Sequence, residues 1–289
     1  MNGSWRLTRV AGIDISLHWT FGLLMGWVVF ATWQEGGLAT AINEALFVSL
    51  LFGCVVLHEL GHALAARTYG IPTNGITLLP IGGVAQLARI PRNPGQELII
   101  ALAGPAVNVV IAAFLLVLLT LNAGLEQLAS VSVISGGLVP RLLAVNVMLV
   151  LFNLLPAFPM DGGRVLRATM ALMTDYPRAT YLAARVGQGT ALLLALVGLN
   201  WNPMLLIIAA FVVFAAEAEL RQVMSEEQRR QRFEEPPVMH SDPSGTIIEG
   251  QVIDRGSHDR RPPAGGQKQP VTATIVWPNN SSVTPTQRC

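Results

Sequence analysis

The chain alternates long apolar stretches with short polar ones, in the pattern of a protein that crosses a membrane several times. A helix needs about 20 predominantly apolar residues to span the hydrocarbon layer of a bilayer. Six stretches reach that length: 15–34, 43–66, 97–121, 139–158, 180–199 and 203–221. The pattern therefore predicts an all-α polytopic membrane protein with about six transmembrane helices. The first stretch keeps His18 inside it and lacks an Ala-x-Ala cleavage site, so we interpret it as a retained span rather than a signal peptide.

Two regions depart from this pattern. Prolines and glycines break residues 71–94 around two β-prone runs, 76–79 and 84–87, which predicts a small membrane-associated β-hairpin. From residue 225 the chain is rich in Pro, Gly, Ser, Gln and Arg and poor in large apolar residues. Such a composition buries too little apolar surface to fold. We therefore expect a transmembrane domain at 1–224 and a polar, disordered cytoplasmic tail at 225–289, with a short β-prone piece at 271–277.

Composition supports a membrane environment. The chain is 52% hydrophobic and 13% charged with a mean hydropathy of +0.49, whereas a soluble domain carries about 25% charged residues. A formal net charge of +1 leaves no basic field for nucleic acid. The expected surroundings are thus a lipid bilayer, without nucleic acid. Cys54 and Cys289 lie in such different contexts that neither a disulfide framework nor a cysteine metal site is expected.

The arginines predict an orientation. Positively charged residues in short loops remain in the cytoplasm. If the N-terminus is inside, the loop arginines fall on the cytoplasmic side, and only Arg141 clearly lies outside. We therefore expect a multi-pass protein of the cell membrane with both termini in the cytoplasm.

Near the end of the second stretch lies a His-Glu-x-x-His motif, His58 to His62. Four residues of helix bring both imidazoles to one face, about 6 Å apart along the axis, which suits a single zinc ion. Glu59 is one step around the helix and suits a general base acting on water at the metal. Ionisable residues within a span are costly and mark functional sites. Arg67 marks the membrane edge, which puts His58 on the order of 13 Å below it.

A catalytic zinc site needs a third protein ligand. The carboxylates on the same side of the membrane are Glu97, Asp161, Asp175, Glu217 and Glu219. Glu97 is typical of the acidic first turn of a helix, and Asp175, Glu217 and Glu219 are typical of solvated charges at span ends. Asp161 differs because prolines precede it and glycines follow it, and irregular backbone at membrane depth lines protected cavities.

Asp161 has to lie at the depth of His58 to share its metal. A continuous helix from Arg141 would instead carry Asp161 about 30 Å, to the cytoplasmic surface. We therefore expect Pro156 and Pro159 to stop the helix early. Arg164 and Arg167 would then snorkel outward to water.

Four motifs, together with their order along the chain, resemble the site-2 protease family in its archaeal and bacterial branch. They are the His58–His62 motif, the stretches 153–163 and 103–108, and the loop 79–84. A short opening segment at 13–19 is similar as well, and the resemblance covers about residues 8 to 222. It implies an intramembrane zinc metalloprotease that hydrolyses peptide bonds within or near transmembrane segments during regulated intramembrane proteolysis. Its substrate would be a single-span membrane protein, such as an anti-sigma factor.

The resemblance also implies roles for individual residues. One zinc ion per chain would be bound by His58, His62 and Asp161, with Glu59 as general base. Asn153 would hold the substrate or the oxyanion, and the loop 71–87 would offer a strand edge to the unwound substrate. Gly82, Gly83 and Val84 lie in that loop, where a glycine pair allows another backbone to approach closely. Asn108 belongs to one of the motifs and is expected to help position the substrate.

Several alternatives remain open at this stage. The chain could bind zinc without proteolysis, as a transporter or an inactive scaffold, or it could cleave soluble or lipidated peptides at the membrane surface. Gly82 and Gly83 could merely form a turn. Asn108 and Asn146 could be interhelical hydrogen-bonding groups. His18 is interpreted as an interfacial residue, and Cys54, one turn before His58, as a small buried one.

Overall fold

The computed structural model describes residues 3–80, 82–87, 91–123, 136–234, 240–241 and 247–248. The chain divides into two units, Met1–Glu234 and Glu235–Cys289. In the second unit the described residues form two short antiparallel strands, β5 (His240–Ser241) and β6 (Ile247–Ile248). The predicted β-prone piece at 271–277 lies outside the described residues.

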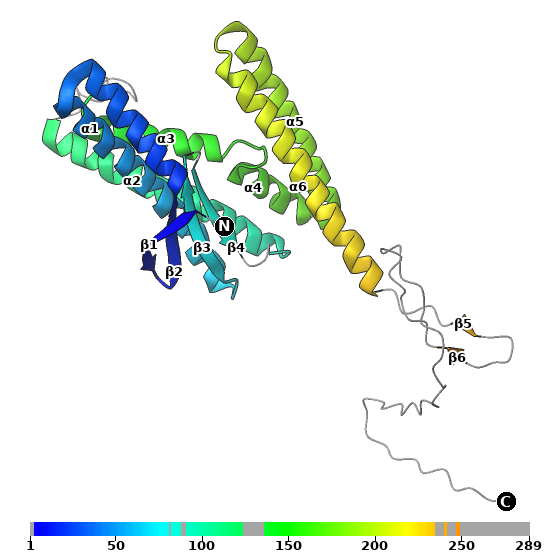
Figure 1. Ribbon diagram of the computed structural model, residues 1–289. Helices are drawn as coiled ribbons and strands as arrows, with labels where there is room; N and C mark the ends of the chain where they lie inside the picture. The colour runs from blue at the N-terminus through cyan, green and yellow to red at the C-terminus, as the bar shows by residue number, and fades with distance from the viewer. Residues whose placement is uncertain are drawn as a thin grey trace, which may run out of the picture. The chain divides into compact units, whose positions relative to one another are not determined.

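The described residues of the first unit form a small sheet and six helices (Figure 1). In chain order they are β1 (Ser4–Val10), β2 (Ile13–His18), α1 (Trp19–Thr68), β3 (Thr73–Leu79), β4 (Gly82–Leu87), α2 (Pro94–Ala123), α3 (Leu138–Asn153), α4 (Asp161–Ala171), α5 (Tyr176–Asn200) and α6 (Met204–Glu234). The unit is thus mostly helical, as the sequence predicts, but its sheet is larger than expected.

The predicted hairpin forms only half of that sheet. Strands β3 and β4 pair antiparallel as expected, but β3 also pairs in parallel with β2, which in turn pairs with β1, in the order β1-β2-β3-β4. The prediction that residues 15–18 begin a span is therefore wrong. Ile13, Ile15 and Leu17 alternate with polar neighbours, which is the period of a half-buried strand. A search for long apolar stretches is insensitive to that alternation.

The sheet packs against the second half of α1. Ile13 and Ile15 from β2 and Ile76 from β3 form a buried cluster with Leu60 and Ala63 of α1. Leu60 and Ala63 flank His62 in the sequence, so this cluster holds the sheet beside the His-Glu-x-x-His motif.

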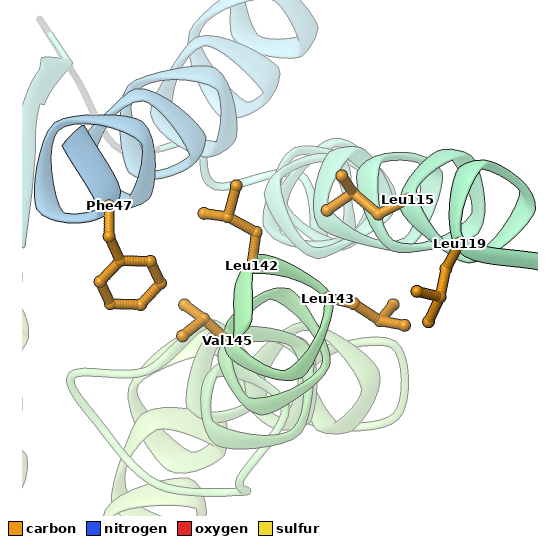
Figure 2. Close-up of a cluster of buried hydrophobic side chains, with 6 residues drawn as sticks. All are labelled: Phe47, Leu115, Leu119, Leu142, Leu143 and Val145. Atoms are coloured by element: carbon orange, nitrogen blue, oxygen red, sulfur yellow. The ribbon is translucent and has the colours of Figure 1, made fainter. Parts of the chain in front are cut away.

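The first two predicted spans form a single helical element with a break. Gly37 in α1 has φ 74° and ψ −170°, which interrupts the helix in a conformation that glycine adopts readily. Helices α1, α2 and α3 then share a core of buried side chains, shown in Figure 2: Phe47, Leu115, Leu119, Leu142, Leu143 and Val145.

The fourth predicted span is shorter than expected. Helix α3 ends at Asn153, before Pro156, and residues 154–160 are non-helical before α4 begins at Asp161. The expectation that the prolines stop this helix early is confirmed. Helix α4 is a separate helix that the apolar pattern of the sequence does not predict.

Helices α5 and α6 lie side by side (Figure 1) and pack on the 154–160 segment through small residues. Ala157 and Phe158 contact alanines of both helices, and a Cβ on Gly187 would lie 3.1 Å from Cα of Ala157. Small residues allow backbones to approach closely within a membrane. The transmembrane domain is predicted to end at Met224. Helix α6 continues ten residues further, to Glu234.

Within the described residues, three helices are long and apolar enough to cross a membrane: Trp19–Thr68, Pro94–Leu121 and Tyr176–Asn200. Helix α3 is also apolar but has only 16 residues. Large apolar side chains are exposed on these elements, including Trp27 (67% exposed), Val110 (67%) and Leu193 (65%). Exposed apolar surface of this extent is typical of contact with lipid.

Candidate metal centre and active site

Two glycines bring α1 and α2 into close contact at the His-Glu-x-x-His motif. A Cβ on Gly61 would lie 2.8 Å from the carbonyl oxygen of Ala103, and a Cβ on Gly104 would lie 2.2 Å from Nε2 of His62. Both separations are too short for a side chain. Because glycine occupies both positions, α2 packs directly over the two imidazoles, and His58 and His62 are only 6% and 4% exposed.

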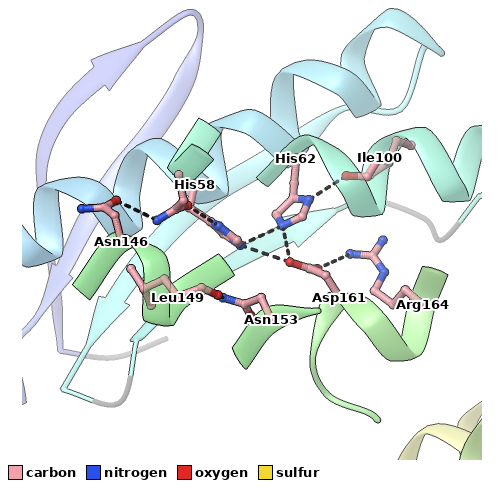
Figure 3. Close-up of polar contacts among 9 residues, drawn as sticks. His58, His62, Ile100, Asn146, Leu149, Asn153, Asp161 and Arg164 are labelled. Atoms are coloured by element: carbon pink, nitrogen blue, oxygen red, sulfur yellow. Dashed lines mark hydrogen bonds and ion pairs between the residues drawn. The ribbon is translucent and has the colours of Figure 1, made fainter. Parts of the chain in front are cut away.

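Asp161 completes a cluster with the two histidines (Figure 3). Its Oδ2 lies 3.1 Å from Nε2 of His58 and 3.0 Å from Nε2 of His62, and the two Nε2 atoms are 3.1 Å apart. Ligands of a tetrahedral zinc ion with bonds of about 2.0–2.1 Å are separated by about 3.3 Å. The three atoms therefore have nearly the separations that a shared zinc ion requires.

The hydrogen-bond partners of the imidazoles indicate where their protons lie. Nδ1 of His62 lies 2.7 Å from the carbonyl oxygen of Ile100, which can only accept, so this nitrogen carries the proton. In the neutral ring, Nε2 then presents a lone pair to Asp161. Nδ1 of His58 lies 2.7 Å from Oδ1 of Asn108, which has the same consequence. Two nitrogen lone pairs and a carboxylate thus converge on one point, as a metal cation requires.

The segment before α4 brings Asp161 to this point. A Cβ on Gly162 would lie 2.2 Å from the carbonyl oxygen of Leu155, and one on Gly163 would lie 2.7 Å from the carbonyl carbon of Ala157. The two glycines therefore allow residues 154–160 to fold back onto the first turn of α4. The nearest cation to Asp161 among the described contacts is Arg164, at 3.9 Å from Oδ1, the oxygen that does not face the imidazoles.

Glu59 lies beside the first residues of β4. A Cβ on Gly83 would lie 2.8 Å from Cγ of Glu59 and 3.3 Å from Cγ1 of Val55. The strand therefore passes directly over the Glu59 side chain, which glycine alone permits. Gly82 precedes it with φ 137°, a conformation that other residues rarely adopt. Among the described strands, β4 lies at the end of the sheet and pairs on one side, with β3.

Two asparagines expected at the site occupy different positions. Asn108 is fully buried, and its amide contacts His58 through Oδ1 and Asn146 through Nδ2, at 3.0 Å. Both ends of the Asn108 amide are thus used inside the protein, one of them beside His58. Its expected role in positioning the substrate stays a prediction. The contact with Asn146 joins α2 to α3, as an interhelical hydrogen bond. Asn153 is the last residue of α3 and donates to the carbonyl of Leu149; its catalytic role stays a prediction.

The prediction that Arg167 snorkels to water is wrong. Arg167 is 1% exposed and donates to Oε1 of Glu97 at 2.9 Å and 2.5 Å, and it also binds Glu219. Glu97 lies in the first turn of α2, as predicted, and is also fully buried against Arg167. Glu219, interpreted as a solvated charge, instead pairs with Arg167. A buried arginine needs carboxylate partners, and the fold supplies them from α2 and α6. Helical spacing within α4 cannot reveal partners that lie on other helices.

The remaining candidates lie outside the metal cluster. Nδ1 of His18 lies 2.7 Å from Oγ1 of Thr20 at the start of α1. Cys54 is buried, as expected, with its sulfur 3.4 Å from Nδ2 of Asn146. Asp175 is an exposed residue next to Arg178. Sequence reasoning missed the Ile100 carbonyl, because a main-chain acceptor has no side-chain signature.

Comparison with known proteins agrees with this geometry. The model of peptidase family M50 matches residues 46–137 and 126–196. The chain is 41% identical over 224 residues to the zinc metalloprotease MJ0392 of Methanocaldococcus jannaschii, which aligns over 77% of this chain and 62% of that protein. It is 30% identical to stage IV sporulation protein FB of Bacillus subtilis, over 65% of this chain and 59% of that protein.

A solved structure shares the fold as well. The site-2 protease from Methanocaldococcus jannaschii superposes with a TM-score of 0.54 at 40% sequence identity, over 75% of this chain and 95% of that chain. The chain spans about three fifths of the full length of the curated relatives described above. From the matched family model and these similarities, the chain belongs to peptidase family M50.

Proposed function

We propose that this chain is an intramembrane zinc metalloprotease that hydrolyses peptide bonds of membrane proteins within or near their transmembrane segments. The observation that carries the proposal is the position of Glu59, adjacent to a buried cluster of two imidazoles and a carboxylate and directly beneath an edge strand. A site that only stores or transports zinc has no need of a carboxylate base beside the ligands.

Each group has a chemical role in this proposal. The zinc would be held by His58, His62 and Asp161. When bound, it would supply Lewis acidity at the scissile carbonyl and lower the pKa of water to about 7. Glu59 accepts the proton from the attacking water and returns it to the leaving amine, as a general base and then a general acid. The half-buried position of Glu59 allows its carboxylate to face the site from the helix that carries both histidines.

Strand β4 is proposed to hold the substrate. A transmembrane helix keeps its carbonyl groups in internal hydrogen bonds, so it must unwind before hydrolysis. Pairing of the freed backbone with a strand edge replaces the lost bonds. Gly82, Gly83 and Val84 begin β4, and the contact of Gly83 with Glu59 would bring a paired substrate backbone close to the base. The substrate proposed is a single-span membrane protein.

We also propose six membrane spans with both termini in the cytoplasm. Two arginine environments support this topology. Arg67 lies at the end of α1. Arg141 of α3 pairs with Glu44 of α1 at 2.6 Å, and Glu44 lies 23 residues before Arg67 in that helix. That separation corresponds to about 34 Å of helix, close to the thickness of a bilayer. Arg141 would thus lie on the outer side and Arg67 on the cytoplasmic side.

Cys289 provides a test of this topology, because Cys54 is buried. A membrane-impermeant maleimide should label the chain in inverted vesicles and leave it unlabelled in intact cells. Labelling of intact cells would place the C-terminus outside and refute the topology.

Glu59→Gln is the deciding experiment for the activity. The variant should bind one zinc per chain, as the unaltered protein does, because no ligand is changed. Cleavage of single-span peptides in detergent should fall by about 10²–10⁴-fold, the contribution of a general base. If a panel of such peptides is not cleaved by the unaltered, zinc-loaded protein, the alternative of a zinc-binding membrane protein without proteolysis is favoured.

A further inference from the structure

The two imidazoles of the site obtain their orientation from different kinds of partner. His62 donates to the main-chain carbonyl of Ile100. That group cannot turn around, so the tautomer of His62 is fixed by the backbone. His58 faces Oδ1 of the Asn108 side chain. A side-chain amide presents an acceptor at one end and donors at the other, and a rotation of 180° exchanges them.

Rotation of the Asn108 amide would be incompatible with metal binding. It would direct the NH2 group at Nδ1 of His58, which would then have to accept, and the ring proton would move to Nε2. That nitrogen lies 3.1 Å from Asp161 and 3.1 Å from Nε2 of His62. A proton there would occupy the position where the metal ion has to bind. Some further group must therefore keep the Asn108 amide in its observed orientation.

Asn146 is that group in the contacts of the structure. Its Nδ2 lies 2.8 Å from the carbonyl oxygen of Leu142, four residues earlier in α3, and 3.0 Å separates its Oδ1 from Nδ2 of Asn108. The carbonyl of Leu142 can only accept, so the Asn146 end beside it must be the NH2 group. Its oxygen then faces Asn108 and requires a donor there, which leaves the Asn108 oxygen for His58.

Burial makes this chain of contacts specific. Asn108 and Asn146 are both 0% exposed, so water cannot replace a lost partner. Reversing either amide would set two acceptors or two donors against each other, and such an unpaired buried group costs about 1–3 kcal/mol. The Sγ of Cys54, 3.4 Å from Nδ2 of Asn146, is a weak acceptor on the same side and favours the same orientation.

We propose that Asn146 is a positioning residue of the metal site, which transmits the polarity of the Leu142 carbonyl through Asn108 to His58 and so keeps Nε2 of His58 unprotonated for the metal. The inference rests on the proposed zinc site but not on proteolysis. Helix α3 supplies none of the three proposed ligands. Under this proposal its residue Asn146 nevertheless determines the tautomer of His58, a ligand on α1.

The test is a double-mutant cycle on zinc affinity, measured with the full chain in detergent by competition with a chromophoric chelator. Asn146→Leu should weaken zinc binding by about tenfold, the lower end of the effect of outer partners on metal sites. Asn108→Asp supplies a carboxylate whose two oxygens are equivalent, so its rotation has no consequence for His58. In the Asn108→Asp background, Asn146→Leu should therefore weaken zinc binding by less than about twofold, within the error of additivity.

Thr180→Val is the matched control, because Thr180 is also 0% exposed and donates only to a carbonyl four residues earlier in its own helix, that of Tyr176. Its zinc affinity should equal that of the unaltered chain. The proposal is overturned if Asn146→Leu leaves zinc affinity unchanged, if it weakens binding equally in both backgrounds, or if Thr180→Val weakens binding as much. Absence of zinc binding by the unaltered chain would instead refute the proposed metal site.

Discussion

Helix α4 carries two buried polar clusters that resemble each other in position and differ in charge. At its first residue, Asp161 meets His58 and His62, and six residues later Arg167 binds Glu97 and Glu219. Both clusters join helices distant in the sequence. The Arg167 cluster contains its own cation. The Asp161 cluster presents lone pairs to a shared point.

This difference separates a structural cluster from a functional one. A buried charge is stable only with a partner of opposite charge, and Glu97 and Glu219 provide that partner for Arg167. Aromatic rings support the same guanidinium, with the centroid of Phe158 5.0 Å and that of Tyr176 5.1 Å from its central carbon. Among the described residues, the arginine paired with Asp161 faces Oδ1, and Oδ2 faces the two imidazoles, where a metal cation would bind. Substitutions in the two clusters should therefore have different consequences.

The largest effect on the metal site is expected from loss of an imidazole. His58→Ala or His62→Ala should reduce zinc content from about one ion per chain to near zero, since two protein ligands do not make a stable zinc site. Elemental analysis of washed protein measures this. His18→Ala is the matched control and should keep its zinc, because His18 contacts Thr20 outside the cluster. Retention of zinc by either alanine variant of the motif would contradict the proposed ligand set.

Loss of the carboxylate should come next. Asp161→Ala should weaken zinc binding by more than about 100-fold, beyond the range of outer partners. Glu97→Gln and Asp175→Asn should leave zinc affinity unchanged, because neither carboxylate lies in the metal cluster. Chelator competition distinguishes these variants. If Asp161→Ala retained its zinc affinity while Glu97→Gln lost it, Glu97 rather than Asp161 would be the third ligand, and the proposed ligand set would be refuted.

A smaller effect, on turnover alone, is expected from Gly83→Ala. The added Cβ would lie 2.8 Å from Cγ of Glu59, so the strand or the base must move. A displacement near 1 Å lowers the rate by up to about 100-fold, while zinc content stays unchanged. Gly53→Ala, with no atom within 4 Å of its added Cβ, is the control on the same helix as Glu59. Normal turnover of Gly83→Ala would show that β4 does not act with the base.

The role of the β4 edge can be examined further with proline. Neighbouring N–H groups of a strand point to opposite sides, so of Val84→Pro and Ala85→Pro one removes a donor toward β3 and the other a donor on the free edge. Both should lower turnover with zinc unchanged. Normal cleavage by both variants would leave β4 a connector.

Substitution of Arg167 should have the smallest effect on the metal site and a large one on stability. Arg167→Met leaves Glu97 without its buried partner, which costs about 3–5 kcal/mol in the free energy of unfolding. Thermal denaturation in detergent reports this loss. The folded fraction should still bind zinc with its original affinity. Loss of zinc from a fully folded Arg167→Met variant would show that the two clusters are coupled through α4.

Much of this protein could be predicted from local features of its sequence. Apolar stretches of sufficient length predict helices in a membrane, because the bilayer imposes one length on all of them. The His58–His62 spacing predicts two imidazoles on one helical face, since it depends only on the pitch of a single helix. The prolines at 156 and 159 predict the early end of α3, because the loss of an N–H acts locally.

The tertiary structure alone decided which distant groups meet. The N-terminal strands were missed because a strand pair requires a partner elsewhere in the chain, and β2 finds its partner in β3 across the whole of α1. Arg167 was assigned to water because its carboxylates lie on α2 and α6. The orientation of His58 depends on Asn108 and Asn146 from two further helices. Hydrogen bonds and ion pairs act over about 3 Å in space, regardless of separation along the chain, so their partners are fixed only when the helices pack.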